Sequence, residues 1–457
     1  MKPREHWGSR IGFIMATAGS AVGLGSLWKF PYVTGEHGGG FFVIAFLVFT
    51  FFVGAPIFAA ELIMGRKSQK SPVGAFTDLS NQSQNWKLLG WLCVFINFLI
   101  LSYYSVVAGW AVNYTLLSLN HFTENRTPQE ISAVFDTMYQ AGGINLFWHF
   151  IFMLLAVGVV YGGIKRGIEY WSKILMPGLL IILIGLLIYG MTLDGFGEAV
   201  RFVFYPDLAK FRASSILEAL GLSFFTLSVG LGIMLTYGSY MRKSDDIPKT
   251  VVTVAIMDVS VALMAALMIF PIIFTFGFTP SAGPGLLFKT LPVLFAKLPG
   301  TLVLSTLFFV LVVFTALTSA ISILEVLVAT FMELLGWSRG KAILWIGLAV
   351  FVFGIPSALS GAGDIFPQWS EMYGRNFFDT VDHVSNNWLL PISGMLIAVF
   401  AGWFLDKELL KSEFYQGTAM GKLFRPWLFL LKYIAPVAVF LVMLQKGGVL
   451  DIDSFFH

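Results

Sequence analysis

The chain has 457 residues, of which 57% are hydrophobic and only 12% are charged, and its mean hydropathy is +0.80. A soluble protein of this length needs more charge to cover its surface, and the single cysteine, Cys93, excludes a disulfide framework and a cysteine-based metal site. The net charge of +3 is small and no nucleic-acid-binding signature is present, so the composition predicts a membrane protein with many spans and no nucleic-acid partner.

Eleven apolar segments are long enough to cross a hydrocarbon layer about 30 Å thick as helices. Their runs are continuous rather than alternating, which excludes barrel strands. The polar start, residues 1–10, leads into an apolar run that is too long for a cleavable signal peptide. The expected spans are 10–34, 39–65, 88–120, 147–164, 169–190, 214–238, 249–278, 300–332, 341–359, 381–404 and 427–445.

Most lysines and arginines between the spans fall on one side of the membrane if the N-terminus is placed in the cytoplasm. The positive-inside rule therefore predicts a cytoplasmic N-terminus, and an odd number of spans then places the C-terminus outside. Two segments between spans are expected to fold. Thr127-Pro128-Gln129-Glu130 is typical of a helix start, and 281–299 is too short and proline-broken to span, which favours a re-entrant or lid-like hairpin.

Two spans contain glycine-rich interruptions flanked by hydroxyl residues. The first is Gly19-Ser20-Ala21-Val22-Gly23-Leu24-Gly25-Ser26, and the second, five spans later, is Thr226-Leu227-Ser228-Val229-Gly230-Leu231-Gly232. An unwound stretch is tolerated in a membrane only where it is buried or lines a cavity, and breaks at corresponding positions indicate a transporter site at the midplane. Close helix packing through a small-xxx-small spacing is the alternative interpretation of the first break.

The positions of the two breaks predict one domain, 1–457, with residues 10–190 and 214–404 as repeats of opposite topology and 427–445 as an eleventh span. Free carbonyls at such breaks can bind a cation, and the N-termini of half-helices can bind a carboxylate.

Motifs along most of the chain resemble those of the neurotransmitter:sodium symporter family. They are Arg4-Glu5-His6-Trp7, the glycine run of 19–26, Phe30-Pro31, Gly38-Gly39-Gly40, Glu61 before Gly65-Arg66, Tyr103-Tyr104, Phe224-Phe225-Thr226-Leu227-Ser228 and Tyr237-Gly238-Ser239-Tyr240. The resemblance runs from about residue 4 to residue 445, and eleven spans are typical of bacterial members. It implies an all-α polytopic protein with the leucine-transporter-like fold, a 5+5 inverted repeat in which helices 1 and 6 are unwound.

The resemblance implies two sodium sites built mainly from hydroxyl and carbonyl oxygens, which are ligands that suit a hard cation. The first would use Ala21, Ser26, Thr226 and Asp258, together with the substrate carboxylate. The second would use Gly19, Val22, Thr315, Thr318 and Ser319. For Thr318 and Ser319, bonding to their own helix carbonyls is the structural alternative.

The resemblance also implies a substrate site between the two breaks and a gate at each end of the pathway. The substrate residues would be Ser20, Ala21, Gly23, Leu24, Gly25, Ile100, Tyr104, Phe225, Thr226, Ser228, Leu231, Ser319 and Ile323. Lys29 and Asp382 would form the outer gate, and Arg4 and Glu333, beside Trp7 and Tyr240, the cytoplasmic gate. The mostly apolar lining predicts a hydrophobic amino acid as substrate.

Three departures from the family pattern change the expected chemistry. Many relatives carry Asn where this chain has Ser26 and Asp258, and chloride-dependent relatives carry a hydroxyl where it has Ala262. The Asp258 carboxylate would bind the first sodium ion and supply the negative charge that chloride supplies elsewhere, so we expect no chloride requirement. Lys29 replaces the commoner arginine and cannot form its bidentate fork, which predicts a weaker outer gate.

Three further features lie within the spans. We expect Glu61 to accept hydrogen bonds from unwound backbone, whereas Glu325 has either a structural or a proton-carrying role. Gly167 and Pro177 are spaced as in relatives whose fifth span unwinds at its cytoplasmic end, although a plain helix start is the alternative.

Together these features predict a symporter rather than an enzyme, with two sodium ions, an amino-acid substrate and the lipid bilayer as its partners, and no obligate protein partner. Its expected place is the cell (inner) membrane. An amino-acid-binding sensor and a proton-coupled transporter are the alternatives. Catalytic motifs for a membrane enzyme and repeated filter loops for a channel are absent from the sequence.

Overall fold

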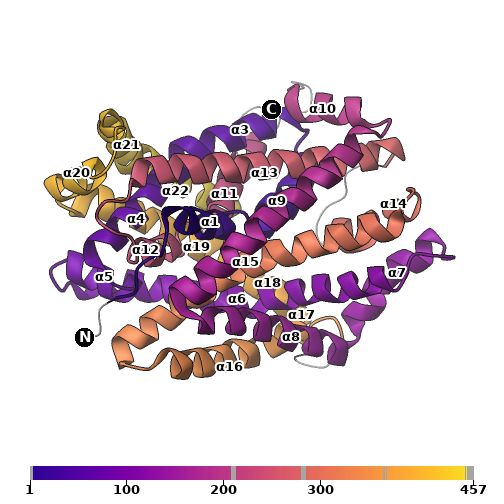
Figure 1. Cartoon of the computed structure of the whole chain (residues 1–457), viewed down its shortest axis with the longest axis horizontal. Coiled ribbons are helices and arrows are strands. Elements are labelled where there is room, and N and C mark those ends of the chain that lie inside the picture. The colour runs from indigo at the N-terminus through magenta and orange to yellow at the C-terminus, as the bar shows by residue number, and fades with distance from the viewer. Residues whose placement is uncertain are drawn as a thin grey trace.

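The computed structural model describes residues 4–206, 213–278, 285–363, 366, 368–447 and 449. These residues form helices and connecting turns, with an isolated bridge between Gly39 and Pro206. Nine of the helices in the described part of the chain are long and apolar enough to cross a membrane, and a tenth span is a pair of helices that meet at a 50° bend. Figure 1 shows the long helices running along the longest axis of the molecule.

The unbroken spans follow the expected apolar segments, with ends that extend into polar sequence. The largest difference is in the tenth span, expected at 381–404, where α17 and α18 already begin at Trp369 and Phe377. Polar residues such as Asp379 interrupt the apolar run there without interrupting the helix. The nine spans are Gly40–Ser68 (α3, η2, α4), Gln84–Leu119 (α6), Gly142–Tyr161 (α8), Ile164–Met191 (η3, α9), Ile247–Thr275 (α13), Thr301–Leu335 (α15), Arg339–Ala358 (α16), Trp369–Phe404 (α17, α18, η6, α19, η7) and Gly421–Lys446 (η8, α21, η9, α22).

The first and sixth spans are both broken, as the glycine-rich runs predict. The first consists of α1 (Arg10–Ala21), then η1 (Gly25–Lys29) and α2 (Phe30–Glu36). The sixth consists of α11 (Ala213–Thr226) and α12 (Ile233–Gly238). Among the described residues α11 by itself is a shorter apolar helix, so the sixth span is counted as a span from its sequence and not from helix length.

The helices pack in two groups, and the first half of the broken first span contacts both of them. In one group α6 packs against α15, α8 and α16, and in the other α4 packs against α12 and α13. The helix α1 contacts members of both, since it packs on α15 and on α13. The interruption in the first span therefore lies where the two groups meet.

The short helices cover the ends of the bundle. Thr127 caps α7 (Pro128–Gln140) in a capping box with Glu130, which confirms the helix start predicted there. Segment 281–299 contains η5 (Leu286–Thr290) and α14 (Leu291–Ala296), which run on as one short apolar helix, too short to span as expected, while residues 281–284 lie outside the described residues. The remaining short helices are α5 (Pro72–Leu79), α10 (Phe196–Phe204) and α20 (Lys407–Tyr415).

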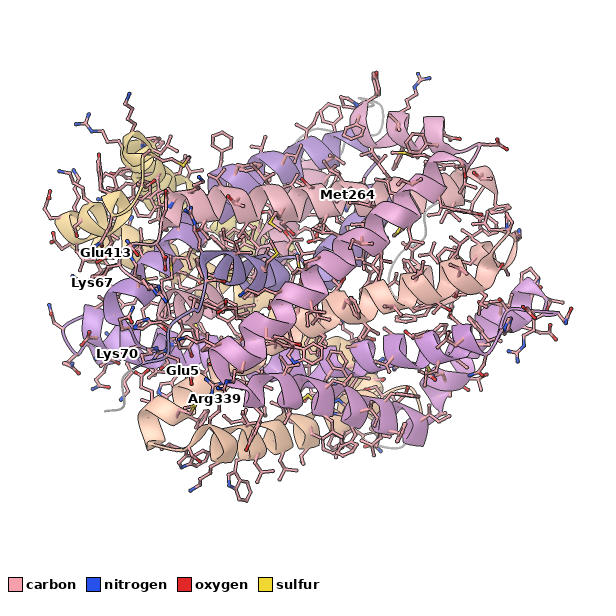
Figure 2. All side chains as sticks on the ribbon, viewed as in Figure 1. Glu5, Lys67, Lys70, Met264, Arg339 and Glu413 are labelled. Atoms are coloured by element: carbon pink, nitrogen blue, oxygen red, sulfur yellow. The ribbon has the colours of Figure 1, made fainter. Side chains whose placement is uncertain are left out.

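Two ends of the bundle can now be distinguished. The N-terminal face carries the start of the chain, α5 and α20, and the opposite face, called here the C-terminal face, carries α7, α10 and α14 (Figure 1). Charged side chains gather at the N-terminal face, where Figure 2 labels Glu5, Lys67, Lys70, Arg339 and Glu413. This charge pattern is the one that predicts a cytoplasmic N-terminus.

Candidate functional site

The break in the first span leaves several backbone groups outside regular helix. After α1 ends, Val22 adopts φ −73° and ψ 79°, and the chain resumes helix only at Gly25. The Val22 N–H donates to Ala18 and the Gly23 N–H donates to the Ala21 carbonyl, at 2.7 and 2.8 Å. The regular helical hydrogen-bond pattern is therefore interrupted at this turn, and carbonyl oxygens that leave such a pattern are potential ligands for a cation.

The break in the sixth span is held open by side chains of other helices. Gly230 and Gly232 have φ of +86° and +68°, values that side chains with a Cβ rarely adopt. Glu61 accepts the Gly230 N–H at 2.7 Å, which confirms the prediction that this carboxylate binds unwound backbone. Asn97 donates to the Leu231 carbonyl at 2.6 Å, and Ser393 donates to the Gly230 carbonyl at the same distance.

The two breaks lie against each other. The Ser228 hydroxyl of the sixth span donates to the Ser20 carbonyl of the first at 2.8 Å. Gly25 packs so tightly that a Cβ there would lie 2.7 Å from the Phe225 ring and 3.2 Å from the Thr226 side chain. The structure thus brings together residues from both interruptions, which lie some two hundred positions apart in the sequence.

Asp258 provides the clearest test of whether the first predicted ion set suits a cation. It lies fully buried in α13, and one of its oxygens accepts a hydrogen bond from Ser26. Its other oxygen, Oδ2, is buried and has no hydrogen-bond partner. A buried carboxylate that is ionised is stabilised by a positive charge nearby, and the adjacent hydroxyls of Ser26 and Thr226 are suitable further ligands for sodium.

The second predicted ion set lies where α1 meets α15. Gly19 packs against the Thr318 side chain, and the Ser319 hydroxyl reaches the Ser20 carbonyl at 3.4 Å. Thr315 and Thr318 donate to carbonyls of their own helix, the local bonding considered from the sequence. A hydroxyl that donates its proton in this way keeps its oxygen lone pairs, so the arrangement is compatible with binding a cation.

The proposed substrate lining is mostly apolar and buried. Leu24, Ile100, Leu231 and Ile323 are each at most 5% exposed, and Phe225 is half-buried. The Tyr104 hydroxyl lies beside Ser319 and the Leu24 backbone, and no hydrogen bond of normal geometry satisfies it. A buried, unpartnered hydroxyl beside free backbone groups is a suitable donor to a carboxylate.

Comparisons with known proteins agree with this arrangement. The model of the sodium:neurotransmitter symporter family matches residues 4–127 and 125–449. The sodium-dependent transporter YhdH of Bacillus subtilis is 39% identical in sequence, and the match covers 97% of this chain and 98% of YhdH. The sodium-dependent transporter MJ1319 of Methanocaldococcus jannaschii is 31% identical, and the match covers 98% of this chain and 91% of MJ1319. The crystal structure of MhsT in complex with L-phenylalanine superposes on this chain with a TM-score of 0.88. The match covers 97% of this chain and 100% of the MhsT chain, and the two sequences are 39% identical.

The chain belongs to the sodium:neurotransmitter symporter family. It is therefore a sodium-dependent symporter with many membrane spans and not an enzyme, and it has the leucine-transporter-like fold that the sequence predicts.

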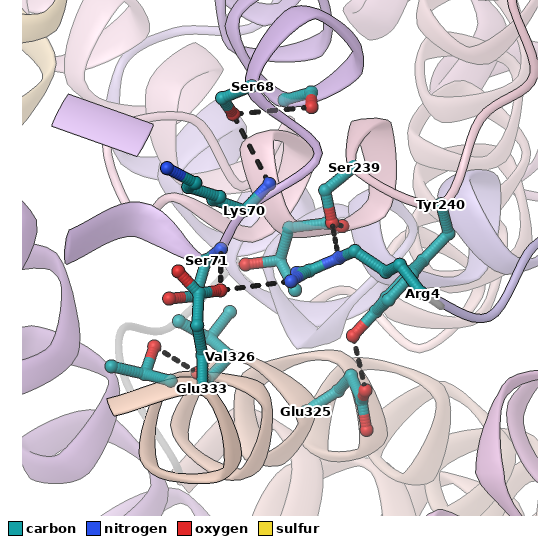
Figure 3. Close-up of polar contacts among 12 residues, drawn as sticks. Arg4, Ser68, Lys70, Ser71, Ser239, Tyr240, Glu325, Val326 and Glu333 are labelled. Atoms are coloured by element: carbon teal, nitrogen blue, oxygen red, sulfur yellow. Dashed lines mark hydrogen bonds and ion pairs between the residues drawn. The ribbon is translucent and has the colours of Figure 1, made fainter. Parts of the chain in front are cut away.

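The N-terminal face of this symporter is closed by a charged network (Figure 3). Arg4 forms an ion pair with Glu333 at 2.9 Å and also donates through Nε to the Ser239 hydroxyl at 2.9 Å. Glu333 accepts a further bond from the Ser71 backbone N–H at 2.7 Å, and the Arg4 guanidinium lies over the Tyr240 ring. The structure thus pairs the two residues expected at the cytoplasmic gate.

Trp7 and Glu325 extend this network into the bundle. Trp7 is 2% exposed, and its indole N–H donates to the Tyr237 carbonyl at 3.1 Å. Glu325 accepts the Tyr240 hydroxyl at 2.7 Å and pairs with Arg339 through both oxygens at 2.7 and 3.0 Å. The role of Glu325, left open by the sequence, is therefore at least structural in this symporter.

The residues expected at the outer gate are arranged differently. The Lys29 ammonium lies 5.1 Å from the centroid of the Phe225 ring, and Asp382 accepts a bond from Asn386 at 2.7 Å. The ion pairs found among the described residues do not include one between Lys29 and Asp382. Nearby, Lys446 at the end of α22 contacts Glu218 at 3.6 Å and Asn387 at 3.0 Å.

Asn97, Ser393 and Arg339 are contributors that sequence reasoning missed. The available signal was a polar or charged side chain inside or beside an apolar span, which requires a partner. The sequence alone does not identify that partner, because Asn97 and Leu231 are 134 positions apart.

Proposed function

We propose that this symporter moves hydrophobic L-amino acids, aliphatic or aromatic, with two sodium ions and without chloride. The observation that carries the proposal is the buried Asp258 carboxylate, which is hydrogen-bonded to Ser26 and has its second oxygen unpartnered beside the break in the first span. A fixed negative charge at this position balances one sodium ion without a bound anion. The second ion would be bound by Gly19, Val22, Thr315, Thr318 and Ser319.

The lining supports a hydrophobic substrate. Its side-chain part consists of Ile100, Phe225, Leu231 and Ile323, which offer apolar surface and no charge. The carboxylate of the substrate would lie between the first break and the Tyr104 hydroxyl, and its amino group would meet carbonyls of the sixth span. MhsT, whose crystal structure contains L-phenylalanine, supports an amino acid of this type.

In the proposed cycle the N-terminal face lies in the cytoplasm of a cell that carries the protein in its inner membrane. Sodium and substrate bind from outside and stabilise an occluded state, and their affinities are coupled reciprocally. Opening of the Arg4–Glu333 network then releases sodium and substrate inward. A membrane potential contributes about 2.3 kcal/mol per charge per 100 mV to this step.

Two other functions make different predictions from the same site. A sensor would bind the amino acid saturably without net uptake. A proton-coupled transporter would accumulate substrate under a pH gradient alone, with Asp258, Glu61 or Glu325 as carrier. The pairing of Asp258 with neutral hydroxyls, rather than with a second titratable side chain, favours sodium.

Uptake into proteoliposomes tests the proposal. Labelled phenylalanine, leucine, tryptophan and alanine are supplied with an inward sodium gradient, with potassium as the control and with chloride replaced by gluconate in parallel. Accumulation that requires sodium and proceeds equally in gluconate is expected. Uptake that collapses in gluconate overturns chloride independence, and saturable binding without accumulation supports the sensor.

Asp258→Asn supplies the matched variant. It preserves the shape of the side chain and removes its charge, so sodium affinity should fall by about 10-fold or more, as expected when an ion loses its charged partner. Unchanged sodium dependence in Asp258→Asn would contradict a direct role of the carboxylate in ion binding.

A further inference from the structure

The Glu169 carboxylate, which is separate from the charged network of Arg4 and Glu333, forms hydrogen bonds with the N-terminal segment of the chain. Glu169 in the fifth span accepts the Gly8 backbone N–H at 2.6 Å and the Ser9 hydroxyl at 2.7 Å. Its side chain is 3% exposed. Both donors belong to the segment that leads into α1, so Glu169 connects the fifth span to the N-terminal half of the first.

The first turn of α1 is shaped around this carboxylate. A Cβ at Gly12 would lie 2.3 Å from the Glu169 side chain, so only glycine leaves room for it there. Ser9 is also the N-cap of α1, since its oxygen accepts the Gly12 N–H at 3.0 Å. The negative charge of Glu169 thus lies at the N-terminus of α1, where the helix dipole favours an anion.

The same stretch of the fifth span makes another contact with the N-terminal segment. Glu5 accepts the Ile164 backbone N–H at 2.9 Å, directly after Gly163, which has a φ of +74°. Residues Ile164–Glu169 are wound as a π-helix, and regular helix follows from Tyr170. Two hydrogen-bonding carboxylates therefore join the N-terminal segment to a part of the span with irregular winding.

Lys173 gives Glu169 a partner that does not depend on the N-terminal segment. It lies one turn along the same helix, pairs with Glu169 at 2.6 Å, and its side chain is 40% exposed. When Gly8 and Ser9 move away, this lysine still compensates the carboxylate. The buried charge therefore does not prevent release of the segment, which the loss of its only partner would do.

From these contacts we propose that Glu169 is a positioning residue for transport, which keeps the N-terminal half of the first span against the fifth span. Release of that half at the N-terminal face then requires Glu169 to give up Gly8 and Ser9, either directly or by unwinding of Ile164–Glu169. The inference rests on the proposed transport cycle and adds to it that this half of the first span moves when the N-terminal face opens.

Cysteine labelling of the full chain in sealed vesicles of known sidedness tests the inference. One reporter is Ala16→Cys in α1, which is 2% exposed, and the other is Val33→Cys in α2 towards the C-terminal face, which is 5% exposed. Native Cys93 is fully buried, and the chain without reporters gives the background. A membrane-impermeant maleimide is applied from the matching side, without amino acid and in sodium or potassium.

Glu169→Gln should raise the labelling rate at position 16 about 10-fold, because two hydrogen bonds lose their charged acceptor, and should lower the rate at position 33. Opposite changes at the two ends indicate a shift between two pathway states, whereas general loosening raises both rates. Lys173→Gln preserves the bonds to Gly8 and Ser9 but removes the partner that remains when they leave, so it should lower the rate at position 16 and not raise it.

A second pair of variants separates the carboxylate from its surroundings. Gly12→Ala, which displaces the carboxylate, should also raise labelling at position 16, but it should add little in a Glu169→Ala background. Unchanged labelling at position 16 in Glu169→Gln, or a rise at both reporters, overturns the inference. A lack of sodium-driven uptake would contradict the proposed function. The labelling rates would still test the role of Glu169, because labelling needs no substrate.

Discussion

The ion pairs at the two faces of the symporter differ in how deeply they are buried. At the N-terminal face, Arg4–Glu333 and Arg339–Glu325 are ion pairs of 2.9 and 2.7 Å, and Glu325 is fully buried. At the C-terminal face, Lys446 and Glu218 are 3.6 Å apart and Lys289 and Asp136 are 2.6 Å apart, but Glu218 is 38% and Asp136 is 52% exposed. Buried pairs cost several kcal/mol when one partner is removed, while exposed ones contribute little. The ion pairs at the N-terminal face are therefore the more buried ones and should contribute more to stability.

The contrast follows from which residues the chain places at each end. Arginine donates to two acceptors at once, and Arg4 does so with Glu333 and Ser239. Lysine at position 29 offers a point charge, which in this structure lies over an aromatic ring instead of beside Asp382. Variants at each face test whether the ion pairs at the N-terminal face contribute more to transport than those at the C-terminal face.

The largest effect is expected from Glu325→Gln. It leaves the guanidinium of Arg339 with a neutral partner in a place where only 15% of that side chain is exposed. Sodium-driven uptake should fall by at least about 10-fold, as for a broken buried pair. The double variant Glu325→Gln with Arg339→Gln should recover part of the loss, since it removes the uncompensated charge; an additive loss would contradict this coupling.

A smaller effect is expected from Arg4→Lys. The lysine retains the charge towards Glu333 but cannot also donate to Ser239 as the arginine Nε does. Uptake should fall about three- to ten-fold, with faster labelling of a cysteine reporter at position 16. Equal uptake in the two proteins would show that charge alone maintains closure at this face.

At the opposite end, Asp382→Asn should change uptake by no more than about three-fold, because Asp382 is hydrogen-bonded to Asn386 and lacks an ion-pair partner among the described residues. Transport rates over a range of substrate concentrations measure this. A loss as large as that of Glu325→Gln would mean that the outer residues act strongly in another state of the cycle, and the comparison of the two ends would fail.

The smallest effect is expected from Lys29→Arg, which brings a bidentate donor to the C-terminal face. A guanidinium can pair with Asp382 in a fork, so labelling of a cysteine at position 33 should slow by about two-fold. A faster rate would contradict the view that the lysine weakens closure at this end.

The sequence predicts the spans and the breaks well because both depend on local signals. The apolar runs define the helices, and the glycines around Ala21 and Leu231 mark the unwound turns. Partners across the bundle are harder to predict. Glu61 was expected to bind unwound backbone, but the contributions of Asn97 and Ser393 depend on packing between spans that no local pattern records.

Charges near the membrane surface show the same limit. Arg4 and Glu333 were paired by resemblance to a family, whereas the partner of Glu325 was not predicted, since Arg339 begins the next helix, α16, after the turn that follows α15. The approach of Glu169 to Ser9 depends on a tertiary contact between residues 160 positions apart. Identifying such contacts requires the fold.

The break in the sixth span has a consequence for how substrate preference can change over evolutionary time. Its backbone is bound by Glu61, Asn97 and Ser393, and its shape is fixed by Gly230 and Gly232. The side chain between these glycines, Leu231, contributes nothing to that framework. In the proposed function, a single replacement at this position would therefore alter the size of the amino acid accepted while the proposed sodium ligands stay in place, so related chains could differ in substrate and keep their sodium coupling.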